Sequence, residues 1–199
     1  MSNLFETWTN QDVSDLVAAY PLAMIISKGS DFATTLMPML LDVDAQGSPV
    51  SLTGHFPRAS AHFAQLSEQP HALFLFQGPH AYVSPTIIRK KSWAPTWNFA
   101  VVRIVANVQF DEGLTDEALD RVSAHMEAGE KNPWTRAELG VRDEQLRKAV
   151  IGFRAPIDSL TARFKLGQDE SPESLADIAE NIDNAPLIAW MRRFNQTRM

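Results

Sequence analysis

Short apolar runs bounded by turn residues dominate the first half of the chain, and they predict β-strands. The strands predicted in this way are residues 21–27, 35–43, 49–54, 73–77, 99–110 and, later in the chain, 151–157. A turn at residues 45–47 makes a hairpin of the second and third strands. Pro38 lies within the second strand and is expected to push it towards an edge or a bulge.

Helical spacing of apolar residues occurs in shorter stretches between and after these strands. Helices are predicted at residues 11–19, 57–68, 114–128, 142–150 and from 171 onward. Thr115 is expected to cap the third helix, and Ser171 followed by Pro172 marks the start of the last one. Strands joined by hairpin turns, with interspersed helices, indicate an antiparallel barrel surrounded by helices rather than an alternating βαβ sheet.

Composition narrows the class of protein. The chain has 199 residues, a net charge of −6 and no cysteine, so we expect one domain over residues 1–199 with a helical segment at 171–199. The absence of cysteine excludes disulfides, thiolate metal sites and cysteine nucleophiles. No apolar run is long enough for a membrane span and the first residues do not resemble a signal peptide, so a cytoplasmic location is expected.

Common motifs of catalysis and nucleic-acid binding are missing from the chain. There is no glycine-rich nucleotide loop, no Walker loop and no nucleophile elbow. The five histidines form no pair at helical spacing, so no metal site is predicted. The acidic balance, with a pI near 5.3, argues against direct DNA binding, which needs a basic face. The catalytic residues stay unknown at this stage.

Two segments, residues 76–85 and 94–99, concentrate rigid, aromatic and polar residues. Proline and glycine around His80 and Tyr82 predict a fixed loop leaving a core strand, and such loops often carry binding sites. His80 and Tyr82 are candidates for acid–base chemistry only because they lie in that predicted loop. In the second segment Trp97 offers a flat apolar face. The alternatives are a hairpin corner whose aromatics cover the barrel end, and a Trp97 packed in the core.

A third segment, residues 52–60, runs from a strand into a helix start. Backbone amides at a helix N-terminus, together with the Arg58 guanidinium, make a reasonable phosphate cradle to which Ser60 and His55 can add. The alternative is an ordinary helix cap beside a solvated arginine.

These segments, in this order, resemble the PaiB family of FMN-binding proteins, often labelled negative transcriptional regulators. The family pattern is G-H-x-A-R-A-N, then F-x-G-P-x-A-Y-x-S-P, then P-T-W-N-Y and finally K-F-K-L-S-Q. The corresponding segments here are residues 54–60, 76–85, 95–99 and 163–168. The resemblance covers about residues 15–182, and the four ordered motifs make it specific.

The resemblance implies a mainly β fold with peripheral helices, a split antiparallel β-barrel like that of the pyridoxamine phosphate oxidases. It implies a homodimer with FMN at the interface between the chains. The phosphate would lie at residues 54–60, and the isoalloxazine ring would lie against barrel strands and be completed by the partner chain. The residues implied to bind FMN are Gly54, His55, Arg58, Ser60, Tyr82, Ser84, Thr96, Trp97, Asn98, Lys165 and Gln168.

Several positions depart from the family pattern. They are Pro57 and Ser60 in the cradle, Ile87 and Ile88 after the Ser-Pro pair, Phe99, and Gly167. Three functions therefore stay open: a flavin-dependent oxidoreductase, a regulator that acts indirectly or through a partner, and a structural dimer whose groove holds heme, another planar ligand or no cofactor.

Overall fold

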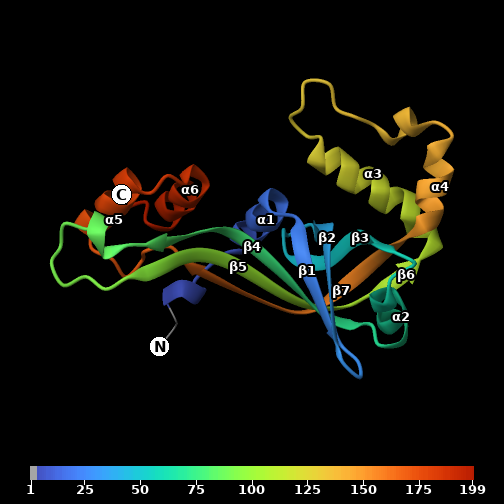
Figure 1. The fold of residues 1–199 in the computed structure, drawn as a ribbon, viewed down its shortest axis with the longest axis horizontal. Helices are drawn as coiled ribbons and strands as arrows, with labels where there is room; N and C mark the ends of the chain where they lie inside the picture. The colour runs from blue at the N-terminus through green and yellow to red at the C-terminus, as the bar shows by residue number, and fades with distance from the viewer. Residues whose placement is uncertain (1–3) are drawn as a thin grey trace. The chain divides into compact units, whose positions relative to one another are not determined.

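The computed structural model describes residues 4–199 (Figure 1). The strands are β1 (Leu22–Lys28), β2 (Phe32–Val43), β3 (Pro49–Pro57), β4 (His71–Val83), β5 (Thr96–Asn107), β6 (Gln109–Asp111) and β7 (Val150–Lys165). The α-helices are α1 (Asn10–Ala19), α2 (Ala61–Glu68), α3 (Thr115–Met126), α4 (Arg142–Ala149), α5 (Pro172–Asn181) and α6 (Ala185–Phe194). Short 3₁₀ helices are η1 (Leu4–Glu6), η2 (Pro85–Ile87), η3 (Glu112–Leu114) and η4 (Arg136–Leu139).

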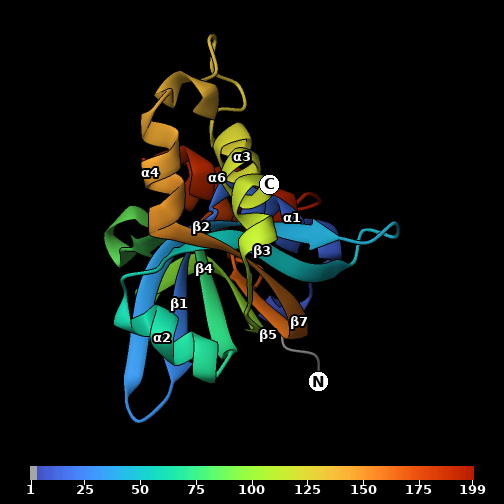
Figure 2. The same ribbon diagram turned by 90° about the vertical axis from the view of Figure 1, so that its right-hand side faces the viewer.

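Six of the strands close into an antiparallel barrel (Figure 2). Their order is β3-β2-β1-β4-β5-β7, and a pairing between β3 and β7 closes the ring, while β6 pairs with β7. Closure leaves no free edge on the ring, which a sheet of this size would otherwise have to protect. The prediction of an antiparallel barrel with peripheral helices is confirmed.

The chain divides into two compact units, which we describe separately. The barrel unit comprises residues 10–76 and 103–160, and the helical unit comprises residues 4–9, 77–102 and 161–199. The expectation of a single domain over residues 1–199 stays a prediction.

The barrel unit is held by a core of large apolar side chains. Strand β1 alternates, with Ala23 and Ile25 buried and Leu22 and Met24 exposed, as expected for a strand with one face in the core. Gly54 favours this packing, because a Cβ there would lie 3.2 Å from both the Met39 Cβ and the Phe153 ring, closer than an ordinary van der Waals contact. Helices α1, α2 and α3 pack against β2, and α3 also packs against β3.

One buried polar cluster interrupts this apolar core. His62 is only 5% exposed, and its Nε2 and Nδ1 atoms lie 2.9 Å from the Ser27 hydroxyl and 2.7 Å from the Thr35 hydroxyl. Gln65 donates a further hydrogen bond of 2.8 Å to Ser27. Burial lowers the pKa of His62, so the imidazole is neutral in this cluster at neutral pH.

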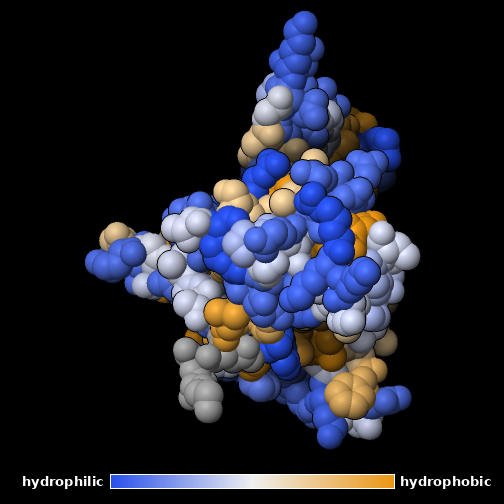
Figure 3. Space-filling model, turned by 90° about the vertical axis from the view of Figure 1, so that its left-hand side faces the viewer, coloured by the Kyte–Doolittle hydropathy of each residue, from blue (hydrophilic) through white to orange (hydrophobic). Residues whose placement is uncertain are grey.

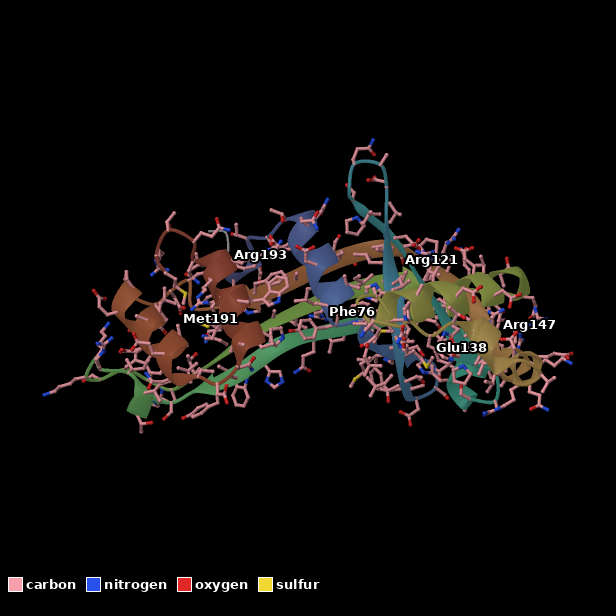
Figure 4. All side chains as sticks on the ribbon, turned by 90° about the horizontal axis from the view of Figure 1, so that it is seen from above. Phe76, Arg121, Glu138, Arg147, Met191 and Arg193 are labelled. Carbon is pink, nitrogen blue, oxygen red and sulfur yellow. The ribbon has the colours of Figure 1, made fainter. Side chains whose placement is uncertain are left out.

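The helical unit has its own core beneath α5 and α6. Phe164 stacks on Trp190 and Phe194, with ring centroids 5.7 and 4.7 Å apart. Met191 of α6 is fully buried (Figure 4). The Asn195 amide closes the end of that helix by donating to the Leu166 and Met191 carbonyls. The predicted helix start at Ser171 is confirmed, since its hydroxyl accepts from the Ser174 amide.

Three local predictions are wrong. The expected loop at residues 76–85 is mostly strand β4, because Gly78 has no left-handed backbone and proline also fits an extended chain. Pro38 lies neither at a sheet edge nor at a bulge. It marks the point where β2 stops pairing with β1 and starts pairing with β3, so its missing N–H is tolerated. Thr115 does not cap α3; its hydroxyl accepts from the Gly152 amide instead.

Candidate functional site

Arg58 is fixed at the junction between β3 and α2. Its backbone amide donates to the Ala149 carbonyl at 3.0 Å, and its Nε donates to the Val150 carbonyl at 2.8 Å. A second guanidinium nitrogen, Nη2, lies 2.5 Å from a carboxylate oxygen of Glu112. The side chain is therefore held by one main-chain acceptor, while another nitrogen of its fork faces an exposed acid.

A cavity of about 430 Å³ opens beside this arginine, lined by Arg58, Glu112, Thr115, Arg147 and Lys148. Arg147, which is labelled in Figure 4, and Lys148 come from the last turn of α4, where cations are favoured by the helix dipole. Their charges are paired with exposed acids, since Arg147 lies 2.8 Å from Asp116 and Lys148 lies 2.6 Å from Glu144. Three cations thus surround one small cavity.

The donor set of this cavity fits a phosphate group. Guanidinium and ammonium groups supply charge-assisted hydrogen bonds to phosphate oxygens, and an arginine fork can donate two of them at once. Sequence reasoning found Arg58 and missed Arg147 and Lys148, which lie about ninety residues away in no recognisable motif. The pairing of β3 with β7 brings these residues to Arg58. Pro57, the residue before Arg58, pairs with Val150, which directly follows α4.

Other members of the predicted cradle have structural contacts instead. Ser60 caps α2, where its hydroxyl accepts from the Phe63 amide at 3.0 Å and donates to the Pro57 carbonyl. Gly54 lies in the barrel packing described above. His55 has a buried Nδ1 atom without a hydrogen-bond partner, and burial lowers the pKa of its ring. Within the described chain, Arg58 is the one residue of segment 54–60 that lines the cavity.

A second candidate surface lies in the helical unit around Trp97. A groove of about 400 Å³ is lined by Gln77, His80, Trp97, Phe99, Ala100 and Val101. Trp97 is 48% exposed, so the alternative that it packs in the core is wrong. It stacks near His80, with centroids 6.0 Å apart, and its Nε1 donates to His80 Nδ1 at 3.3 Å. A neutral His80 therefore carries its hydrogen on Nε2.

Asn98 does not share this groove, contrary to the prediction. It is 1% exposed, and its amide nitrogen lies 3.6 Å from the Met191 sulfur. The reason is strand periodicity, because neighbouring residues of β5 point to opposite faces and Trp97 takes the outer one. Tyr82 stays on the surface beside Trp97, with ring centroids 5.8 Å apart.

The remaining predicted residues make local contacts. Lys165 donates to the Thr96 hydroxyl, and Ser84 caps the short η2 helix. Gln168 closes the turn after β7 by accepting from the Leu166 amide and donating to the Phe164 carbonyl. Gly167 in that turn has a φ of +85°, and a Cβ there would meet Leu175 at 2.7 Å. A residue with a side chain would therefore be strained at this position.

In residues 4–199, no three His, Asp or Glu side chains are grouped so that they could hold a metal ion. No helix in that range is both long and apolar enough to cross a bilayer.

Arg89 begins a short basic run at residues 89–91. Its backbone amide and Nε donate to the buried Asp177 carboxylate, and these hydrogen bonds lower the pKa of Asp177.

The sequence matches a known protein family and a protein of Bacillus subtilis. The model of a family described as "Putative FMN-binding domain" matches residues 1–159. The Protease synthase and sporulation protein PAI 2 of Bacillus subtilis is 27% identical over 138 residues, which cover 67% of this chain and 65% of that protein. The chain thus spans about two thirds of the length of this relative.

Two solved structures share the fold. The FAD and heme binding protein from Mycobacterium smegmatis superposes with a TM-score of 0.59 at 16% identity, covering 88% of this chain and 80% of that one. The flavocytochrome Anf3 from Azotobacter vinelandii gives a TM-score of 0.55 at 17% identity, covering 79% and 68%. At such identities the likeness supports the barrel fold alone.

Proposed function

Because the chain belongs to the FMN-binding domain family whose model matches residues 1–159, we propose that it binds FMN with the phosphate in the cavity at Arg58. The observation that carries this proposal is the convergence of Arg58, Arg147 and Lys148 on one cavity. A phosphate there would receive charge-assisted hydrogen bonds from a guanidinium whose Nε is already held by the Val150 carbonyl, on a backbone that is held by the Ala149 carbonyl. Such preorganisation reduces the entropy lost on binding.

The flavin ring needs a flat apolar surface with a few polar groups at its edge. The groove at Trp97 fits that role, since it offers an exposed indole face, the Nε2–H of His80 and the amide of Gln77. In the resembled family the ring is completed by the partner chain, and we assign this groove to that task. Bound FMN would supply redox chemistry, and the protein would bind and orient it.

The test is a titration of the apoprotein with FMN and with riboflavin, which lacks the phosphate. Arg58→Ala should remove a charged hydrogen bond of roughly 1.5–3 kcal/mol and weaken FMN binding about 10- to 150-fold. Riboflavin binding should change little. Arg192→Ala, which alters an exposed arginine of α6, is the matched control. Equal losses for both flavins would assign Arg58 a structural role, and no flavin binding at all would refute the proposal.

We also propose that the protein is a homodimer paired through the outer face of the β1–β2 hairpin. Leu22, Phe32 and Leu36 are 56%, 67% and 56% exposed, and Met24, which pairs with Leu36, is 38% exposed. Hydrophobic side chains also reach the surface among hydrophilic ones in Figure 3. An apolar face of this kind is typical of an interface. Sedimentation of a 22.2 kDa monomer at micromolar concentration would refute the dimer, and Leu36→Lys should weaken it.

The second candidate is a regulator or structural dimer that holds heme or no cofactor. The Mycobacterium smegmatis neighbour is a FAD and heme binding protein, and the Bacillus subtilis relative is a sporulation protein. A Soret band in place of flavin absorbance would favour heme. Reduction of bound flavin by NADH or NADPH would favour an oxidoreductase. With a net charge of −6, regulation would act through a partner rather than by direct DNA binding, and we keep the cytoplasm as the proposed location.

A further inference from the structure

One arginine outside the phosphate cavity shares a carboxylate with a cation that lines it. Asp116, in the first turn of α3, has one carboxylate oxygen 2.8 Å from Arg147 Nη1 and the other 2.8 Å from Arg136 Nη2. Arg147 lines the cavity, whereas Asp116 and Arg136 do not. We infer that Arg136 is a positioning residue, which acts through Asp116 to keep the Arg147 guanidinium ready to bind a phosphate group. The inference rests on the proposed FMN phosphate site and concerns the way in which that site is held.

Arg136 is held more firmly than the two side chains it acts on. It is 19% exposed, whereas Asp116 and Arg147 are 47% and 45% exposed. Its guanidinium donates to the main-chain carbonyl of Asp116 at 3.3 Å as well as to the carboxylate. Its Nε lies 2.8 Å from an Asp143 carboxylate oxygen, and its Nη1 lies 3.3 Å from Asp120. A planar fork with five donors can engage several acids in this way, and a single ammonium group cannot reproduce that geometry.

Arg136 reaches α3 from the segment that joins α3 to α4. This segment, residues 127–141, extends away from the barrel strands (Figure 1). Arg136 begins η4 directly after Thr135, which forms a capping box with Glu138, and the Thr135 backbone amide donates to the Glu138 carboxylate at 3.0 Å. A capping box fixes the start of a helix. The backbone that carries Arg136 is therefore set by contacts that do not involve the cavity.

Arg147 needs such support because its own helix provides little packing. None of the eight residues of α4 is buried, and a helix of this length is marginal without tertiary contacts. A long exposed side chain that becomes fixed on a ligand loses rotamer entropy, which weakens binding. The ion pair with Asp116 already restricts the Arg147 guanidinium beside the cavity, so less entropy is lost when a phosphate binds there.

The charge of Asp116 would work against Arg147 if Arg136 did not share it. Desolvation acts to raise the pKa of Asp116, but hydrogen bonds from Arg147 and Arg136 together outweigh it and lower that pKa, so the carboxylate is charged at neutral pH. A carboxylate left with Arg147 alone could turn both oxygens to that guanidinium and cancel its charge at the cavity. Loss of Arg136 should therefore weaken phosphate binding in two ways, because Asp116 becomes free to move and its whole charge falls on Arg147.

Arg136→Lys tests this inference, because it keeps the positive charge and removes the fork. The probe is inorganic phosphate, titrated into the full chain by calorimetry. We expect Arg136→Lys to bind phosphate about 2- to 5-fold more weakly than wild type, the scale of an exposed ion pair, and Arg136→Gln to bind it more weakly still. Arg142→Lys is the matched control, because Arg142 is an exposed arginine at the other end of α4 that does not line the cavity. Its phosphate affinity should stay at the wild-type value.

A double-mutant cycle with Arg147→Ala separates positioning from a general effect on the fold. Arg58 and Lys148 remain in that background, so phosphate should still bind, and Arg136→Lys should no longer change its affinity because the residue through which it acts is gone. The same loss with and without Arg147 would overturn the inference, and so would unchanged affinity in Arg136→Lys or an equal loss in Arg142→Lys. Far-UV circular dichroism checks that each variant is folded.

The outcomes also separate the inference from the function on which it rests. A wild-type protein that binds phosphate but not FMN would refute the FMN proposal, while the cycle would still decide the role of Arg136. Absence of phosphate binding in the wild-type protein would refute the proposed phosphate site and the inference with it.

Discussion

Replacing Gly152 by alanine should disturb the junction between η3 and α3. Gly152 lies in β7, opposite His55 on one side and Asp111 on the other. A Cβ at this position would lie 2.5 Å from the Leu114 carbonyl carbon and 2.6 Å from its oxygen and from the Thr115 nitrogen. All three atoms belong to the backbone, so no side-chain rotation can relieve the contact. The junction would have to move by most of an ångström.

The change in free energy of unfolding follows from two contributions that destabilise the fold and one that stabilises it. Overpacking of a tight site costs about 1–3 kcal/mol, and distortion of the buried Gly152–Thr115 hydrogen bond, 3.0 Å long, costs about 1 kcal/mol more. Alanine restricts the unfolded chain and returns about 0.4–1 kcal/mol. The steric contribution wins, and the net loss in free energy of unfolding should be about 1–3 kcal/mol. For a chain of this length that lowers Tm by about 2–12 °C.

Urea and thermal unfolding of Gly152→Ala, compared with wild type, measure this loss. Gly113→Ala is the matched control, because its Cβ would meet a flexible side-chain oxygen of Asp111 at 3.3 Å and no backbone atom of that kind. A Gly152→Ala protein within about 0.5 kcal/mol of wild type, the range of an ordinary surface substitution, would refute the steric argument.

Three further predictions concern the groove and the core. Trp97→Ala should lower the free energy of unfolding by about 1 kcal/mol or less, because Trp97 is half exposed. The same substitution should change the affinity for flavin or the flavin spectrum. A large drop in Tm with unchanged flavin affinity would contradict this prediction. Asn98→Ala should cost about 1–3 kcal/mol in urea unfolding without altering flavin absorbance, since the side chain is buried. Burial lowers the pKa of His62, so the unfolded chain takes up a proton first, and stability should fall as pH drops below about 6.5. His62→Asn should flatten that part of the profile, and an equally steep loss in the variant would contradict the assignment.

Much of the barrel was predictable, because alternating apolar and polar residues and valine-rich runs directly indicate strands. The hairpin of β2 and β3 and the core strand β5 follow from such patterns. The predictions went wrong where one residue type serves two conformations. Gly78 and Pro79 are turn residues in isolation, but extended backbone suits both, and strand β4 continues through them.

The candidate site was predictable only in part, because its residues meet through pairing of distant strands. Arg58 is recognisable from its place before a helix, whereas Arg147 joins it only because β3 pairs with β7. The sequence predicts the adjacent residues Trp97 and Asn98 as one functional pair. In a strand they must face opposite ways, so one lines a groove and the other is buried.

Strands β4, β5 and β7 each give residues to both the barrel unit and the helical unit, so the chain changes units inside strands rather than in linkers. No single stretch of the gene encodes either unit. A stop codon near residue 160, close to where the family match ends, would leave residues 77–102 without Phe164, Trp190 and Phe194 to complete their core. A single contiguous segment that carries all of one unit must therefore also carry residues 77–102 or 103–160 of the other.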